Sequence, residues 1–432
     1  MRTFKKITLT EGHCFKDQLL QWAQQFDEVV WLDSNSHNQQ YSSYDAVLAV
    51  DAFTLLQTDY INAFDQLKEY QSSTNDWLFG YLSYDLKNDT ENLESVNFDG
   101  LNFPELFFFQ PKKVFLLKGN TLEMQYLKFV DDELDDDYSQ IATFEQVSPE
   151  ETKPEPIKIK LRMTKDNYFE QFQKIHKHIL RGDIYEVNFC QEFYAENTCI
   201  NPLAVYTKLN SISNPPFAAY FKNADKFAIS ASPERYLQKK GSTIVSQPIK
   251  GTAKRSKDVV EDAQLKYNLE HDEKERSENI MIVDLVRNDL SKTAVKGSVN
   301  VTELCKVYTF DQVHQMISTV TAEVEHTKSP VEVLRTTFPM GSMTGAPKVS
   351  AMEIIERVEV TKRGLYSGAI GYFTPGNDFD FNVIIRSILY NSTNKYVSYS
   401  VGGAITAKAT AEAEYQECLL KAKAMREALL AT

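Results

Sequence analysis

A helical repeat of apolar residues follows Thr164. Large apolar side chains recur there at three- and four-residue steps, which places them on one face of a helix. They are Tyr168, Phe169, Phe172, Ile175 and Ile179. Thr164 is suited to cap the first turn and Gly182 to end the last one. The pattern therefore predicts an amphipathic helix over residues 165–181.

The remainder of the second half alternates short apolar segments of strand character with longer helical segments. Strand-like segments lie at 217–221, 227–230, 243–246, 379–385 and 396–401, and helical segments lie near 258–286, 330–336, 347–357 and 411–429. Several gaps between strands have the length of hairpins, which favours antiparallel sheets over a regular βαβ series. The predicted fold class is α+β, with antiparallel sheets sandwiched by helices.

The first 150 residues contain few candidate catalytic or ligand-binding residues. Strand-like runs occur at 28–32 and 113–117, and a helical stretch lies around residues 15–26. From Asp131 to Pro156 the chain turns acidic and is interrupted by prolines, which is typical of an exposed linker. We therefore expect an N-terminal region over 1–150 and a catalytic region over 157–430, interlaced into one compact body.

The net charge and the composition of the chain exclude several classes of function. The chain has 432 residues and a formal net charge of −13, which repels nucleic acid and anionic lipid surfaces, so neither is an expected partner. No apolar run reaches membrane-spanning length and no secretory signal is recognised. The five cysteines are scattered without a C-x-x-C pair. The expected compartment is the cytoplasm.

One lysine stands in an unusual segment. Lys250 lies in the proline-bounded run 247–252, directly after the apolar residues Ile244 and Val245. An amine held away from water there would lose proton affinity and become a better nucleophile. A solvent-exposed lysine in a turn is the commoner case for such spacing. The hypothesis from the residues alone is a nucleophilic Lys250.

A carboxylate is placed similarly at Glu234, in the segment Ser232-Pro233-Glu234-Arg235 that follows a strand-like run. A turn at the end of a strand could present this side chain to a site, and burial would raise its pKa toward that of a proton donor. The alternative is an exposed turn residue.

Two helical segments each carry acidic side chains on one face. Glu275 and Glu278 are three residues apart, and Glu414, Glu417 and Lys421 share a face of the last helix. If these faces converge, their oxygens would suit Mg²⁺, which completes its coordination with waters and a substrate carboxylate. Ordinary solvated charges on both helices are the alternative.

The glycine-rich segment 341–348 differs from a nucleotide-binding loop. Only three residues separate its glycines, and Pro347 removes a backbone donor that a phosphate would need. We therefore exclude nucleotide binding, although a turn leading into a helix could offer N–H groups to a carboxylate.

Together and in this order, these segments resemble the chorismate-utilising enzymes, which include anthranilate synthase component I, aminodeoxychorismate synthase component I, and the isochorismate and salicylate synthases. The resemblance is strong over 157–430 and weaker at 77–87. The segments that carry it are GDIYEVN (182–188), SPER (232–235), PIKGT (248–252), ENIMIVDLVRND (278–289), GSMTGAPK (341–348), YSGAIG (366–371), FNVIIR (381–386), GGAI (402–405) and EYQE (414–417). It implies the chorismate-binding fold of anthranilate synthase component I.

The resemblance also implies roles for individual residues. Glu278 and Glu417 would bind Mg²⁺ directly, with Glu275 and Glu414 assisting through water. The carboxylates of chorismate would be held by side chains and backbone at Thr252, Tyr366, Arg386, Gly402, Gly403 and Lys421.

The residue at position 250 distinguishes two branches of the family. Anthranilate synthases resemble this pattern with alanine there, whereas aminodeoxychorismate synthases carry lysine. The implied reaction is attack of the Lys250 amine at C2 of chorismate while Glu234 protonates the departing 4-hydroxyl. Ammonia then adds at C4 and expels the lysine, giving 4-amino-4-deoxychorismate for 4-aminobenzoate and folate. Anthranilate synthase component I and a non-catalytic chorismate-binding relative are the alternatives.

Two positions depart from the family pattern. Most amino-transferring members have glutamine where Glu186 stands and histidine where Gln315 stands, so His314 either substitutes for that histidine or is structural. None of the cysteines lies in a glycine-rich elbow of the kind a glutaminase uses. The resemblance therefore implies a separate glutaminase subunit as the source of ammonia.

Overall fold

The computed structural model describes residues 1–9, 12–37, 40–144, 157–310 and 313–431. Its strands are β1 (Arg2–Thr8), β2 (Glu28–Asp33), β3 (Ala46–Thr58), β4 (Leu78–Leu82), β5 (Leu106–Lys118), β6 (Thr121–Leu127), β7 (Lys160–Leu161), β8 (Glu186–Ala195), β9 (Phe217–Asn223), β10 (Lys226–Ser232), β11 (Arg235–Lys240), β12 (Thr243–Ser246), β13 (Ile249–Lys254), β14 (Asn300–Thr309), β15 (Val313–Glu323), β16 (Gly345–Ala346), β17 (Ala369–Phe373), β18 (Phe379–Val383), β19 (Ser387–Asn391) and β20 (Tyr396–Thr406).

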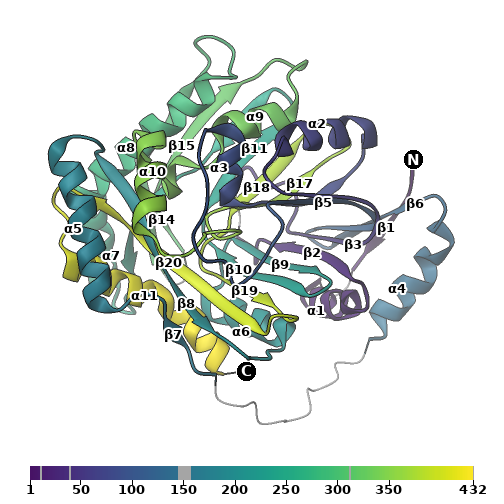
Figure 1. Ribbon diagram of the computed structural model, residues 1–432. Helices are drawn as coiled ribbons and strands as arrows, with labels where there is room; N and C mark the ends of the chain where they lie inside the picture. Colours follow the sequence, from purple (N-terminus) through teal and green to yellow (C-terminus); the bar gives the residue numbers. More distant parts are fainter. Residues whose placement is uncertain (10–11, 38–39, 145–156, 311–312, 432) are drawn as a thin grey trace.

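Helices lie around these strands (Figure 1). They are α1 (Gly12–Trp22), α2 (Ala63–Thr74), α3 (Lys87–Thr90), α4 (Leu134–Ala142), α5 (Lys165–Arg181), α6 (Pro202–Ser213), α7 (Val259–Glu270), α8 (Glu273–Ser291), α9 (Pro330–Thr337), α10 (Lys348–Val358) and α11 (Ala411–Leu430), with short 3₁₀ turns η1 (Ala23–Gln25), η2 (Tyr84–Leu86), η3 (Asp131–Glu133) and η4 (Gly341–Met343).

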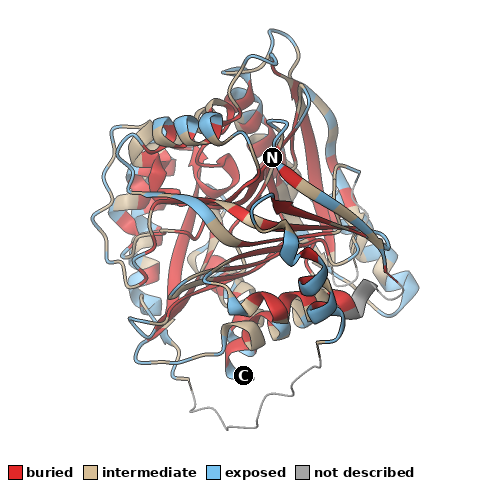
Figure 2. Ribbon diagram, turned by 90° about the vertical axis from the view of Figure 1, so that its right-hand side faces the viewer, coloured by how far each residue is buried: buried red, intermediate tan, exposed pale blue. Residues whose placement is uncertain are grey.

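The named strands pair antiparallel, and strands from both ends of the sequence join one hydrogen-bonded network. β2 pairs with β9, and β4 pairs with β17. In Figure 2 the strands are largely buried, while the helices turn exposed faces outward. Apolar side chains fill the space between these layers because burial removes their surface from water. The predicted α+β class with antiparallel sheets and surrounding helices is confirmed.

The predicted helix after Thr164 is α5. The Thr164 hydroxyl accepts a hydrogen bond from the Asn167 N–H at 3.2 Å, and Gly182 ends the helix with a φ of 87°, a left-handed conformation that glycine adopts without strain. Tyr168, Phe172 and Ile175 are buried, as the periodicity requires.

Two sequence-based expectations were wrong in detail. The segment 258–286 is two helices, since Asp272 caps the start of α8 by accepting from the Glu275 N–H at 3.0 Å. The acidic run from Asp131 onward folds as η3 and α4, because buried Asp137 accepts hydrogen bonds from the Lys113 amine and the Tyr126 hydroxyl. The proline-rich part of the expected linker, 145–156, lies outside the described residues.

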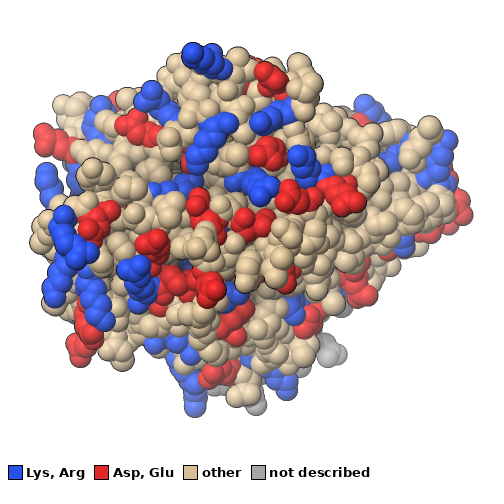
Figure 3. Space-filling model, turned by 45° about the horizontal axis from the view of Figure 1, so that its top comes forward, with Lys and Arg blue, Asp and Glu red and all other residues tan. Residues whose placement is uncertain are grey.

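The surface mixes both signs of charge. On the face in Figure 3, lysine and arginine side chains are interspersed with aspartate and glutamate. Within the described ranges, no helix combines the length and the apolar character needed to cross a membrane.

Candidate active site

Lys250 and Glu186 lie on two different strands, and their side chains are in contact. Lys250 lies on β13, which pairs with β15 and packs against α8, and Glu186 is the first residue of β8. The Lys250 amine donates a hydrogen bond to Glu186 Oε1 at 3.1 Å, and the two side chains are 13% and 2% exposed. The predicted nucleophile is therefore part of a largely buried ion pair and is not an exposed turn lysine.

The proton affinity of Lys250 differs from the sequence-based expectation. Burial by itself lowers the pKa of the amine, but the negative charges of Glu186, Glu278 and Glu234 outweigh burial and raise that pKa above its ordinary value. The expected loss of proton affinity was wrong because the segment 247–252 does not reveal the carboxylates that fold around it. Lys250 thus needs a proton acceptor before it can act as a nucleophile.

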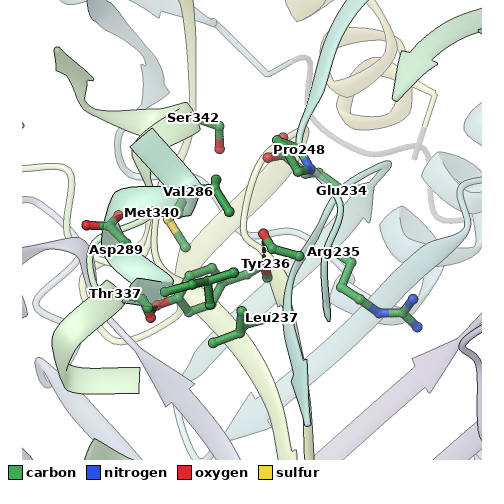
Figure 4. A pocket seen from close by; sticks show the side chains of 12 residues that line it. Glu234, Arg235, Tyr236, Leu237, Pro248, Val286, Asp289, Thr337, Met340 and Ser342 are labelled. Carbon is green, nitrogen blue, oxygen red and sulfur yellow. Dashed lines mark hydrogen bonds between the residues drawn. The ribbon is translucent and has the colours of Figure 1, made fainter. Parts of the chain in front are cut away.

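Glu234 occupies the turn between β10 and β11 and is 5% exposed. Burial raises the pKa of its carboxyl to about 7, although a hydrogen bond with Ser342 and the charge of Lys250 oppose the rise. Figure 4 shows Glu234 and Asp289 on opposite sides of a small cavity, with Ser342 also on its wall. This cavity has a volume of about 20 Å³, enough for about one water. A carboxyl with such a pKa can hold a proton near neutral pH.

The acidic faces of α8 and α11 converge as the sequence suggested. Lys274 lies between them, with its amine 3.8 Å from Glu278 Oε1 and 3.7 Å from Glu414 Oε1. Burial raises the pKa of Glu278 to about 7, and burial followed by the charge of Glu417 raises the pKa of Glu414. Both carboxylates are costly to ionise in the free protein, and the Lys274 amine lies within 4 Å of each.

Glu275 and Glu417 complete this carboxylate group. A Cβ added to Gly251, beside Lys250, would lie 3.2 Å from Glu275 Oε2, and one added to Gly403 would lie 2.8 Å from Glu414 Oε2 and 4.0 Å from Glu417 Oε1. The backbones of β13 and β20 therefore border the carboxylates, and larger residues at these glycines would crowd them.

This group has the chemistry of a divalent cation site. Among the described side chains, buried Glu278 Oε1 and Glu414 Oε2 have no hydrogen-bond partner, which leaves hard oxygen donors unsatisfied. As the described side chains stand, no three of His, Cys, Asp or Glu are gathered to hold a metal ion. Mg²⁺ keeps part of its hydration shell, so waters and a substrate carboxylate would supply ligands beyond those of the protein.

Cationic and polar groups border the carboxylates. The Lys421 amine lies 2.7 Å from both the Gly402 carbonyl oxygen and Glu417 Oε1. Buried Tyr366 has its hydroxyl 3.6 Å from the Cys190 sulfur. Arg386, with a φ of 52°, follows the end of β18. Burial lowers the pKa of its guanidinium, and the negative charge of Glu417 partly offsets this effect.

A cavity of about 200 Å³ extends from this region. Thr252, Arg386 and Gln315 line it, together with apolar residues of α6 and α11. His314 points elsewhere, because neighbours on a strand face opposite sides: its ring contacts Asp262 at 3.1 Å and Thr309 at 3.1 Å. Of the two residues, Gln315 faces the cavity and His314 supports β14 and α7.

Three contacting residues were not found as site residues from sequence. Glu186 was noted only as a departure, Lys274 was not considered, and Ser342 was treated only as part of a turn. The spacing of Lys274 and Glu278 at four residues was a usable signal. Nothing local in the sequence pairs Glu186 with Lys250, since 64 residues separate them.

The sequence of the chain matches the model of a known protein family. The family described as chorismate binding enzyme matches residues 27–427, nearly the whole chain. The chain belongs to this family. The matched range contains all the site residues described above.

Relatives of known name are similar over much of the chain. Aminodeoxychorismate synthase component 1 of Bacillus subtilis is 33% identical over 364 residues, covering 81% of this chain and 76% of the relative. The Escherichia coli protein of the same name is 38% identical, covering 63% of this chain and 60% of the relative. An anthranilate synthase component I-like protein of Synechocystis is 31% identical, covering 85% and 76%. The chain thus spans less than two thirds of the Escherichia coli relative and about three quarters of the other two.

Solved structures share the fold. Anthranilate synthase component I from Streptococcus pneumoniae superposes with a TM-score of 0.76 at 24% identity, covering 90% of this chain and 94% of that one. The menaquinone-specific isochorismate synthase of Escherichia coli gives a TM-score of 0.77 at 16% identity, covering 99% and 95%. The expected anthranilate synthase component I-like fold is confirmed.

Proposed function

We propose that this chain is component I of an aminodeoxychorismate synthase, which converts chorismate and ammonia to 4-amino-4-deoxychorismate. The observation that carries the proposal is the buried Lys250 amine, set among Glu186, Glu234 and Glu278 in a chorismate-binding enzyme. The names of the Bacillus and Escherichia relatives support the same reaction.

Two side chains act on the substrate in this proposal. The Lys250 amine attacks C2 of chorismate, and Glu234, whose pKa of about 7 lets it hold a proton, protonates the departing 4-hydroxyl. Ammonia then adds at C4 and expels Lys250 from C2. Dividing one difficult displacement into two steps is the benefit of the covalent route.

The polar groups that border the carboxylates, together with Thr252 and Arg386 on the cavity wall, would hold the substrate. Chorismate carries two carboxylates, and the cationic groups Arg386 and Lys421 supply opposite charge. Thr252, Tyr366 and the backbone at Gly402 and Gly403 would complete these contacts. A binding mode that fixes both carboxylates places the ring at the lysine and the acid.

Glu278 and Glu417 would hold Mg²⁺ directly, with Glu275 and Glu414 acting through water. When bound, the ion would neutralise a substrate carboxylate and the negative charge of the ring of glutamates. Glu278 Oε1 and Glu414 Oε2, which are buried and accept no hydrogen bond from the described residues, support this assignment.

Mg²⁺ is expected to raise the melting temperature of the protein. Binding at a concentration of 100 times Kd contributes about 2.7 kcal/mol to the free energy of unfolding, a rise of several degrees in the midpoint. The Glu278→Gln variant should lose most of this rise, and Glu273→Gln, an exposed change on the same helix, should keep it. Differential scanning fluorimetry over a Mg²⁺ titration measures both. An equal rise in the Glu278 variant contradicts the assignment.

We place the protein in the cytoplasm, with ammonia supplied by a separate glutaminase subunit. The relatives called component 1 support a partner component. The product would then serve the synthesis of 4-aminobenzoate and folate. The division into regions 1–150 and 157–430 stays a prediction.

The test of the function is product identification. Purified protein is incubated with chorismate, Mg²⁺ and ammonium at mildly alkaline pH, and the products are separated by chromatography and identified by mass. Formation of 4-amino-4-deoxychorismate supports the proposal. Direct formation of anthranilate or isochorismate assigns the chain to another branch of its family, and unchanged chorismate with ammonium and with a glutaminase subunit favours a non-catalytic relative.

A further inference from the structure

Lys274 lies beside carboxylates of two different helices. Its amine is 3.8 Å from Glu278 Oε1 on its own helix, α8, and 3.7 Å from Glu414 Oε1 on α11. Both distances exceed that of a hydrogen bond, so charge alone draws the ammonium to these carboxylates. The Lys274 side chain is 43% exposed, whereas those of Glu278 and Glu414 are 9% and 2% exposed. The ammonium therefore has access to water while it remains next to buried carboxylates.

The position of Lys274 does not suit a lysine that stabilises only its own helix. α8 begins at Glu273, with Asp272 as its cap, so Lys274 lies in the first turn. The positive end of the helix dipole repels a cation there. A lysine that precedes its glutamate by four residues is also in the less favourable order for a pair on one helix. The contact with Glu414 on a second helix offsets this placement, which points to the carboxylate group as the partner of Lys274.

The whole carboxylate group acts on the charge of Lys274. Burial by itself lowers the pKa of the amine, but four negative charges raise that pKa above its ordinary value. They belong to Glu278, Glu414, Glu275 and Glu417. These are the residues proposed to hold Mg²⁺, so the lysine and a divalent cation are attracted to the same place.

The two other lysines beside the group are held by hydrogen bonds. The Lys250 amine donates to Glu186 at 3.1 Å, and the Lys421 amine donates to the Gly402 carbonyl oxygen at 2.7 Å. Lys274 lies beyond hydrogen-bond distance of its carboxylates and is half in water, so it can leave them at low cost.

We propose that Lys274 is a built-in competitor for the metal site: its ammonium balances the carboxylates of α8 and α11 and turns out into water when Mg²⁺ takes their charge. This inference rests on the metal site of the proposed function. Two cations attracted to one group of carboxylates repel each other, so the lysine lowers the affinity for Mg²⁺. In return it stabilises the glutamates when the ion is scarce, because buried like charges without a counter-charge are costly.

Calorimetric titration of Mg²⁺ into chelator-treated protein tests this competition without turnover. Lys274→Gln removes the charge and keeps most of the length of the side chain. The Kd for Mg²⁺ at fixed pH and ionic strength should therefore fall about tenfold in this variant. Lys274→Arg keeps a cation and should stay within about threefold of the unmodified protein.

Melting temperatures supply a second readout. In the presence of a chelator, Lys274→Gln should melt below the unmodified protein, because its carboxylates lack their counter-charge. Saturating Mg²⁺ should remove this difference, so the rise caused by the ion should be larger in the variant. A lysine with a merely structural role would lower the melting temperature equally with and without the ion.

Two controls locate the effect. Lys423→Gln removes an exposed lysine of α11 that lies outside the carboxylate group, so its Kd should equal that of the unmodified protein. Adding Glu278→Gln to Lys274→Gln removes a proposed ligand and should abolish the gain in affinity.

Each result decides the inference. A tighter Mg²⁺ complex in Lys274→Gln that is lost in the double variant supports it. An unchanged Kd overturns it, and so does a weaker complex, because Lys274 then helps to hold the ligands of the ion. If neither the unmodified protein nor Lys274→Gln binds Mg²⁺, the metal assignment of the proposed function fails and the competition fails with it. Product formation is measured apart from binding, so 4-amino-4-deoxychorismate together with an unchanged Kd refutes the inference alone.

Discussion

Replacing Lys250 with alanine is expected to abolish formation of 4-amino-4-deoxychorismate, with turnover falling at least about 1,000-fold. The variant loses the atom that bonds to C2, and the neighbouring carboxylates cannot replace it. The loss should appear in turnover more than in substrate affinity, because Arg386 and Lys421, which are proposed to hold the carboxylates of chorismate, remain. Steady-state rates with chorismate and ammonium, with product read by chromatography, measure both quantities.

The matched control for this change is Lys254→Ala. Lys254 lies on the same strand, β13, and is exposed, so its loss removes a charge without touching the site. Turnover in this variant should equal that of the unmodified protein. If Lys250→Ala retains turnover within about tenfold, the covalent route is wrong and direct displacement by ammonia takes its place.

Replacing Glu234 with glutamine is expected to slow turnover by about 100- to 10,000-fold, the usual contribution of a general acid. The amide keeps the size of the side chain but has no acidic proton for the departing hydroxyl. The pH dependence should change as well. Burial raises the pKa of Glu234 to about 7, and only the protonated form donates, so kcat/KM should fall as pH rises through about 7.

This falling limb should be absent in Glu234→Gln, because the group that titrates has been removed. The exposed change Glu325→Gln serves as control and should keep both the rate and the limb. A pH profile of kcat/KM for the three proteins is the measurement. A limb that persists unchanged in Glu234→Gln assigns it to another group and removes Glu234 as the acid.

Local patterns were sufficient for much of the fold. The three- and four-residue steps after Thr164 specify one face of a helix, and the capping residues at its two ends act over a single turn, so α5 is readable from the sequence. The hairpin-length gaps likewise indicated antiparallel sheets. The acidic run from Asp131 was misread because its helix depends on the Lys113 amine and the Tyr126 hydroxyl, which are distant in sequence.

For the candidate site too, contacts within one helix could be predicted from the sequence and contacts between distant segments could not. Spacing within a helix placed Glu275 beside Glu278 and Glu414 beside Glu417, and the structure brings the two pairs together through Lys274. The charge state of Lys250 could not be obtained from its own segment, since it depends on Glu186 at the start of β8 and on Glu278 of α8. Contacts of this kind arise from strand and helix packing, which no short motif encodes.

The central claim is that Lys250 bonds to the substrate, and mass spectrometry tests it most directly. The protein is mixed with chorismate and Mg²⁺ in the absence of ammonia, quenched and digested, and the peptide that contains Lys250 is weighed. The account predicts an added mass equal to chorismate less one water on Lys250, which disappears when ammonium is supplied. A Lys250 peptide of unchanged mass, from protein that forms 4-amino-4-deoxychorismate once ammonium is added, would contradict it.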